Sequence, residues 1–179
     1  MSARKRQLFM RRPHLDGLPP LPSPPPGYGL RLHRRGEEEF LAAALRGAFP
    51  GSDWSVETVL SRLVDAPDVE AVYVVTFEDV PVGTASARLI PTQYPGTGYL
   101  HWVGVAPAHQ GKRLGALVSL RVLHHFREDG CVDAVLETDD FRLPAIKTYL
   151  DLGFVPEPRD PPDAGRWAAV LQKLGWRGG

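Results

Sequence analysis

Apolar and polar side chains alternate in several segments of the chain, and a period of two is typical of β-strands. Between residues 82 and 90, Thr84, Ser86 and Arg88 alternate with alanine and leucine. The segment before it is rich in valine and aromatic residues, and a short stretch with aspartate and proline separates the two, which predicts an antiparallel hairpin. By similar reasoning, strands are expected at 28–33, 71–77, 82–90 and 99–105. The mostly apolar run at 131–136 suits a strand that is covered on both faces.

Other segments repeat apolar residues every three or four positions, which is typical of amphipathic helices. A first helix is expected from Glu37 because three glutamates occupy its first turn, where the helix dipole favours negative charge. Ser55 suits the N-cap of a second helix. Three further helices are expected: from Ala116 to Gly130, from Pro144 to Gly153, and around Trp167 and Leu174.

Length and composition limit the number of domains. The chain has 179 residues, of which 43% are hydrophobic, and this suffices for one core rather than two. We therefore expect a single domain over residues 27–179. Residues 1–26 are basic and rich in proline, and we expect this arm to lie as a strap over the domain, with a partner-docking segment as the alternative.

Charge and cysteine content argue against several classes of partner. The 21 Lys and Arg residues balance 21 Asp and Glu residues, so neither nucleic acid nor an anionic membrane is expected as a partner. No apolar run approaches the ~20 residues that span a bilayer. Cys131 is the only cysteine, which excludes an internal disulfide and a multi-cysteine zinc site. A single cysteine suits a reducing compartment, so we expect a cytoplasmic protein. His124 and His125 are helix neighbours that point apart, so we expect surface residues and no bound metal.

The junction between an expected strand and an expected helix carries the strongest chemical signal. Residues 103–116 read Val-Gly-Val-Ala-Pro-Ala-His-Gln-Gly-Lys-Arg-Leu-Gly-Ala. Backbone N–H groups in the first turn of a helix have no intrahelical acceptor, and the helix dipole places partial positive charge there. The junction can therefore bind an anion such as a diphosphate, with Lys112 and Arg113 adding charge. It lacks the Gly-Lys-Ser/Thr ending of a P-loop, which argues against nucleoside triphosphate hydrolysis.

A second motif lies downstream, where Ala145, Tyr149, Gly153 and Phe154 form the pattern Ala-x-x-x-Tyr-x-x-x-Gly-Phe. In the order and spacing of its two motifs, the chain resembles the GCN5-related N-acetyltransferase (GNAT) superfamily. The resemblance implies an α/β fold of the mixed α+β kind, in which helices flank a central twisted sheet that is mixed but mostly antiparallel.

The resemblance also implies how this sheet admits coenzyme A. The fourth and fifth strands, 99–105 and 131–137, would splay apart so that the pantetheine arm enters between them. Gly104 would mark a bulge beside this opening, because glycine inside a strand often does.

Two residues depart from the family pattern, one in the coenzyme A loop and one downstream of it. The family's loop signature is Gln or Arg, two residues, Gly, one residue, then Gly or Ala; here Gln110 and Gly115 match, while Arg113 replaces the inner glycine. We expect the Cβ of Arg113 to require a negative φ. Arg142 stands seven residues before Tyr149, where the family often has asparagine. The residues that the resemblance implies for acetyl-CoA binding are Val103, Gly104, Val105, Gln110, Gly111, Lys112, Arg113, Leu114, Gly115, Ala116 and Arg142.

Acetyl transfer from a thioester to an amine needs a neutral amine, a stabilised oxyanion and a proton for the departing thiolate. The resemblance assigns the last role to Tyr149, although a tyrosine on an apolar helix face alone is more often core packing. A backbone N–H near Val105 would meet the oxyanion. For the base we consider first Glu137 and then His101, with ordered water as the alternative route.

The motifs together predict an N-acetyltransferase that moves an acetyl group from acetyl-CoA directly to a primary amine of a small molecule or peptide. A catalytically silent acyl-CoA-binding or regulatory module is the alternative, and a protein-interaction domain that uses the basic arm is a third hypothesis. Members of the superfamily often pair, so a homodimer is one expected assembly. Nothing in the sequence identifies the acceptor.

Overall fold

The computed structural model describes residues 6–178 and contains a seven-stranded sheet with the strand order β2-β3-β4-β5-β6-β1-β7. Every neighbouring pair is antiparallel except β5 and β6, which are parallel, so the expected mixed, mostly antiparallel sheet is confirmed. The strands are β1 (Leu8–Arg12), β2 (Tyr28–Leu32), β3 (Val69–Phe77), β4 (Val80–Leu89), β5 (Thr97–Val105), β6 (Asp133–Thr138) and β7 (Val155–Pro156).

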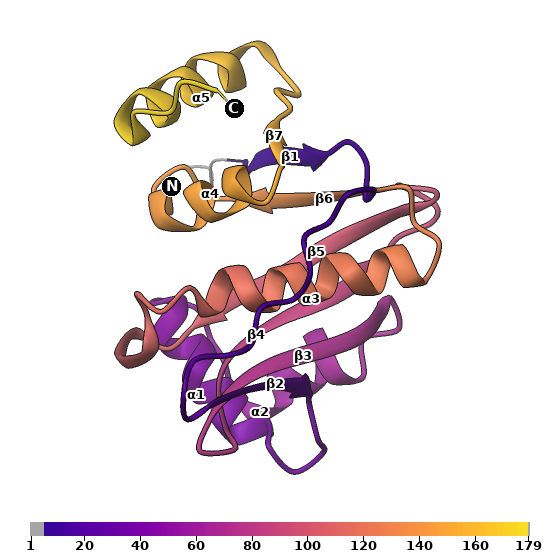
Figure 1. Cartoon of the computed structure of the whole chain (residues 1–179), viewed down its shortest axis with the longest axis vertical. Coiled ribbons are helices and arrows are strands. Elements are labelled where there is room, and N and C mark those ends of the chain that lie inside the picture. Colours follow the sequence, from indigo (N-terminus) through magenta and orange to yellow (C-terminus); the bar gives the residue numbers. More distant parts are fainter. Residues whose placement is uncertain (1–5, 179) are drawn as a thin grey trace.

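Helices cover both faces of this sheet. Figure 1 shows α3 along one face and α1 and α2 behind the other, while α4 and α5 lie at the end of the molecule that holds β6, β1 and β7. All five expected helices are present, and the side chain of Ser55 caps α2 by accepting a hydrogen bond from the Thr58 N–H. The helices are α1 (Glu38–Ala48), α2 (Val56–Val59) with the π-helical η1 (Leu60–Val64), the 3-10 turn η2 (Pro107–His109), α3 (Leu114–Glu128), α4 (Leu143–Asp151) and α5 (Pro161–Leu174). Within residues 6–178, no helix is long and apolar enough to cross a membrane.

Each face of the sheet has its own apolar core. On the face of α3, Val122 and Phe126 pack in one cluster with Leu100 of β5. Gly98 permits this contact, because a Cβ there would lie 2.2 Å from the Phe126 ring. On the other face, Leu41 and Trp54 belong to a second cluster with residues of β3. The two cores hold β5, the strand beside the candidate site, from both sides.

The N-terminal segment contributes a strand that sequence analysis did not predict. Leu8, Phe9 and Met10 are fully buried in β1, which pairs with β6 on one side and β7 on the other. A strand covered on both faces shows no alternation of apolar and polar residues, and the arginines around this apolar trio concealed it further. The same sheet therefore includes part of the segment that we expected to be an arm.

The proline-rich segment after β1 does run as a strap across α3 (Figure 1). Leu15 and Leu18 of this strap are buried. His124 Nε2 lies 2.8 Å from the Pro19 carbonyl oxygen, and His124 is only 8% exposed. The expectation that His124 is a surface residue is therefore wrong, because the strap covers this side of α3.

β5 and β6 diverge along their length, as expected for these strands. Only Thr97–Tyr99 pairs with Asp133–Val135, so the rest of β5 has no strand on that side. On its other side, β5 shifts register against β4 between His101 and Gly104, and Trp102 within this bulge has a φ of +48°. The divergence leaves an open edge on β5, and the bulge lies along that edge.

Gly104 borders the bulge, as expected, although it does not itself supply the unusual backbone. The positive φ belongs to Trp102, and Gly104 stands at the end of the register shift. A Cβ on Gly104 would lie 2.8 Å from the Phe49 ring and 2.9 Å from the Ala48 Cβ. Glycine is needed here because the end of α1 approaches the strand closely.

Candidate functional site

A cleft of about 1680 Å³ opens where β5 and β6 diverge. Its walls come from the end of α1, the bulged part of β5, the start of α3, and the turn between β6 and α4. Among the predicted site residues, those that line it are Val103, Gly104, Val105, Gln110, Gly111, Arg113, Leu114, Gly115, Ala116, Arg142 and Tyr149. Lys112, Glu137 and His101 are not among its lining residues.

The start of α3 offers unpaired backbone donors to this cleft. The helix begins at Leu114, and no side chain caps it. The N–H groups of its first turn therefore have no intrahelical acceptor, and a Cβ on Gly111 or Gly115 would meet nothing within 4 Å. An open, positively polarised helix end of this kind fits an anion such as a diphosphate.

Arg113 adopts a left-handed backbone at this helix start, with φ +59° and ψ +20°. Our expectation of a negative φ is wrong. The loop keeps a conformation that suits glycine, although a side chain with Cβ occupies the position. The guanidinium group is thereby brought to the lining of the cleft beside the unpaired N–H groups.

The free edge of β5 is covered by two polar side chains. Gln110 Nε2 donates to the Val105 carbonyl oxygen at 3.0 Å. Arg142 Nη2 donates to the Val103 carbonyl oxygen at 3.3 Å, and its guanidinium carbon lies 4.3 Å from the centre of the Phe49 ring. When these two side chains move aside, the carbonyl oxygens of Val103 and Val105 can accept hydrogen bonds from an extended ligand, as in a β-sheet.

Tyr149 lies on α4 with its side chain 4% exposed, and it lines the cleft. Within the described residues its hydroxyl has no hydrogen-bond partner, and its ring packs edge-on against Phe154 at 6.1 Å. Burial raises the pKa of Tyr149, and the positive charge of Arg142 opposes that rise. The phenol is thus protonated at neutral pH and able to donate its proton into the cleft.

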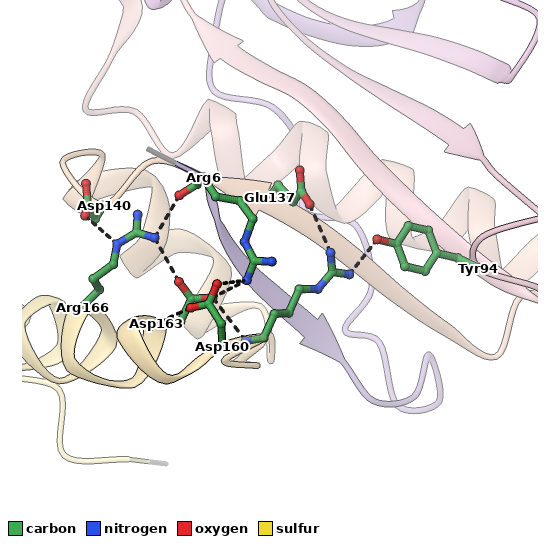
Figure 2. A network of polar contacts seen from close by, with 8 residues as sticks. Arg6, Tyr94, Glu137, Asp140, Asp160, Asp163 and Arg166 are labelled. Carbon is green, nitrogen blue, oxygen red and sulfur yellow. Dashed lines mark hydrogen bonds and ion pairs between the residues drawn. The ribbon is translucent and has the colours of Figure 1, made fainter. Parts of the chain in front are cut away.

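The two predicted bases lie beside the cleft. His101 packs against the rings of Tyr99 and Trp102 at 5.7 and 5.3 Å, and burial lowers the pKa of His101 to about 4. Glu137, labelled in Figure 2, forms an ion pair with Arg159, in which Nη1 of the arginine lies 3.4 Å from Oε1 of the glutamate. The structure brings Tyr149 and the loop before α3 into one lining, but it does not bring either base into that lining.

Sequence analysis missed the aromatic wall at the end of α1. The Phe49 and Trp102 rings meet edge-to-face at 5.2 Å, and Trp102 meets Trp54 at 4.7 Å. The bulge places Trp102 on the same face of the sheet as its neighbour His101, so it faces α1 instead of α3. No local pattern in the sequence marks this wall, although the glycine that follows the aromatic residues of β5 was a hint.

A second missed group comes from the two ends of the chain. Arg6 and Gln7, which precede β1, and Arg166 of α5 all line the cleft. Figure 2 shows Arg6 and Arg166 converging on Asp163, with Arg166 also paired with Asp140. Residues so far apart in the sequence carry no shared motif, and only the fold brings them together.

Several known proteins are similar to this chain in sequence. The family model described as the acetyltransferase (GNAT) family matches residues 34–154. A mycothiol acetyltransferase of Thermomonospora curvata is 30% identical over 159 residues, covering 85% of this chain and 52% of that protein. A mycothiol acetyltransferase of Actinosynnema mirum is 29% identical over 177 residues, covering 96% of this chain and 56% of that protein. The chain thus spans about half the length of these curated relatives.

Solved structures show the same fold. A GCN5-related N-acetyltransferase from Sphaerobacter thermophilus superimposes with a TM-score of 0.63 at 21% identity, over 86% of this chain and 50% of that chain. The ribosomal-protein-S18-alanine N-acetyltransferase from Escherichia coli gives a TM-score of 0.58 at 17% identity, over 70% of this chain and 76% of that chain.

Proposed function

Because the chain belongs to the acetyltransferase (GNAT) family, we propose that it transfers an acetyl group from acetyl-CoA directly to a primary amine. The observation that carries this proposal is the shared cleft of an uncapped helix start, a free strand edge and a buried tyrosine. The helix start suits the diphosphate of acetyl-CoA, the strand edge suits its pantetheine arm, and the tyrosine suits its leaving sulfur.

The residues of the cleft have separate roles in holding the acetyl donor. The N–H groups of Leu114, Gly115 and Ala116 bind the diphosphate, and Arg113 adds a cation beside them. The carbonyl oxygens of Val103 and Val105 accept hydrogen bonds from the pantetheine amides after Arg142 and Gln110 move aside. Bound acetyl-CoA supplies an activated acetyl group as a thioester.

The reaction requires several proton transfers. The neutral amine nitrogen attacks the acetyl carbon to give a tetrahedral oxyanion, the carbon–sulfur bond then breaks, and Tyr149 gives its proton to the sulfur. The protons that nitrogen loses pass to water, because neither His101 nor Glu137 lines the cleft. Water also returns a proton to Tyr149. A backbone N–H near Val105 is the proposed donor to the oxyanion, in keeping with a preorganised strand edge.

The proposal is tested by calorimetry with acetyl-CoA and by colorimetric detection of free thiol with a panel of amines. The panel includes hydroxylamine, simple alkylamines and amines related to mycothiol, for which the curated relatives are named. Binding followed by amine-dependent thiol release is the expected result. Tight binding without thiol release would instead support a silent acyl-CoA-binding module. A cytoplasmic location and a homodimer stay predictions from the sequence.

A further inference from the structure

The turn between β6 and α4 carries two charged side chains that reach toward opposite neighbours of β6. The Arg142 N–H donates to the Asp139 carbonyl oxygen at 3.0 Å, which closes the turn. At the end of the turn, the Arg142 guanidinium donates a hydrogen bond to the Val103 carbonyl on β5. At the start of the turn, the Asp139 carboxylate accepts a hydrogen bond from Gln7, next to β1. One turn therefore places a cation and an anion along the same cleft.

Among residues 6–178, Asp139 is an ionisable group of the cleft that has no counter-ion. Its carboxylate accepts a hydrogen bond from the neutral Gln7 amide, Nε2 to Oδ2, at 3.2 Å. Within residues 6–178 it forms no ion pair, and its side chain is half-buried in the cleft lining. A half-buried carboxylate that is held only by a neutral amide gains more binding free energy from a cationic ligand than a carboxylate that already forms an ion pair.

The nearby arginines do not supply that cation, because their charges are already compensated. Arg6 pairs with Asp160 at 2.8 Å and with Asp163 at 2.9 Å. Arg166 pairs with Asp163 at 3.0 Å and with Asp140 at 3.1 Å. Figure 2 shows these partners as one network. Both guanidinium groups are therefore already paired with carboxylates other than Asp139.

Two cations of the cleft lie away from the β1 side. In the described part of the chain, Arg113 and Arg142 form no ion pair with a carboxylate, and both line the cleft. Arg113 stands at the start of α3, and the Arg142 guanidinium reaches β5, whereas the Asp139 carboxylate reaches Gln7 on the β1 side of the same turn. An anionic ligand suits the two arginines, and a cationic ligand suits the carboxylate.

We propose that Asp139 binds the ammonium group of the acetyl acceptor, so that the acceptor is a cationic amine that enters between the turn and Gln7. This inference rests on the proposed function, and it adds the charge class of the acceptor and the residue that selects it. Gln7 orients the Asp139 carboxylate through their hydrogen bond. Asp139 binds the amine in its charged form, one proton passes to water before the attack, and a second leaves nitrogen as the amide forms.

The test compares amines that differ in charge. Propylamine and ethylenediamine are cations at neutral pH, whereas hydroxylamine is largely neutral there and also accepts acetyl groups. We expect Asp139→Asn to raise KM for the two cationic amines roughly tenfold to a hundredfold, the loss expected for one charge-assisted hydrogen bond. The rate with hydroxylamine and the affinity for acetyl-CoA should change less than about twofold.

Two further variants separate binding from folding. Asp151→Asn removes the same charge from α4, but Asp151 pairs with Lys147 on the exposed side and does not line the cleft, so all rates should stay unchanged. Gln7→Ala should raise KM for the cationic amines severalfold through loss of orientation. A loss with hydroxylamine as large as that with propylamine would overturn the inference, as would normal use of propylamine by Asp139→Asn.

Failure of the proposed function is distinguishable from failure of this inference. Wild-type protein that acetylates hydroxylamine but never a cationic amine keeps the proposed function and refutes the acceptor class. If no amine is acetylated at all, the proposed function fails, and the side-chain amide signal of Gln7 in a nitrogen-15 spectrum still decides the inference. That signal should shift on titration with ethylenediamine in the wild type but not in Asp139→Asn, and the absence of a wild-type shift would refute amine binding.

Discussion

At the scale of single residues, Tyr149 is the group on which the proposed chemistry depends most. Tyr149→Phe should lower kcat for thiol release by about a hundredfold or more, because the departing thiolate loses its proton donor. Acetyl-CoA binding should change little, since the ring and its contact with Phe154 remain. Calorimetry and the thiol assay measure the two quantities separately. A variant with wild-type turnover would remove Tyr149 from the acid role.

The pH profile gives Tyr149 a second signature. Burial raises the pKa of this phenol above its ordinary value of 10.0, so the proton-donating form persists through neutral and mildly alkaline pH. The rate should therefore fall on the alkaline side only above that ordinary value. In Tyr149→Phe, the residual rate should not show this alkaline fall.

Arg113 combines a useful charge with a backbone conformation that disfavours a side chain. At φ +59°, residues other than glycine are strained by about 1–2 kcal/mol. Arg113→Gly should therefore unfold at a higher denaturant concentration than Arg113→Ala, the reverse of the order inside a helix. Both should bind acetyl-CoA more weakly than the wild type, because both lose the guanidinium. Equal stability of the two variants would argue against strain at this position.

At the scale of elements, the close approach of α1 to the bulge of β5 determines the shape of one cleft wall. Gly104→Ala should destabilise the fold by about 1–3 kcal/mol, because its Cβ would lie 2.8 Å from Phe49 and 2.9 Å from Ala48. Displacement of Phe49 should also weaken acetyl-CoA binding. Urea unfolding and calorimetry measure these effects.

Gly165→Ala in α5 is the matched control for that substitution. Its Cβ would meet nothing within 4 Å, and its φ is not in the left-handed region. It should stabilise the protein by about 0.4–1 kcal/mol, because the unfolded chain loses conformational freedom. If both variants destabilise equally, the contact of Gly104 with α1 is not the cause.

Sequence patterns predicted the helices and strands whose two sides differ in the polarity of their side chains. Ser55 and the glutamates from Glu37 mark helix starts by local chemistry, and the alternation in β4 follows from its position in the hairpin. Motif spacing likewise placed Tyr149 beside the start of α3. Local sequence could not reveal Gln7 against Asp139, because two residues 132 positions apart meet only after the sheet has formed.

At the scale of the whole molecule, the sheet depends on the N-terminal segment that composition alone presented as an arm. A chain lacking residues 1–12 should fail to fold, since β6 and β7 lose the strand between them and the buried Leu8, Phe9 and Met10 are lost. Met10→Ala is the milder version and should cost about 2–5 kcal/mol in urea unfolding. Leu21→Ala on the strap, where the side chain is 37% exposed, should cost much less. Unchanged stability of the shortened chain would contradict this role for β1.

The position of β1 also bears on how the protein is made. This strand is synthesised before its partners β6 and β7, which lie far downstream in the sequence. Its apolar side chains must therefore stay unpaired until β6 and β7 have been synthesised, and pairing at such long range is slow. The β1 side of the cleft, where Asp139 meets Gln7, accordingly forms only after β6 has left the ribosome. During that interval the nascent chain exposes a strand prone to aggregation, and its yield in cells should depend on chaperones that cover β1.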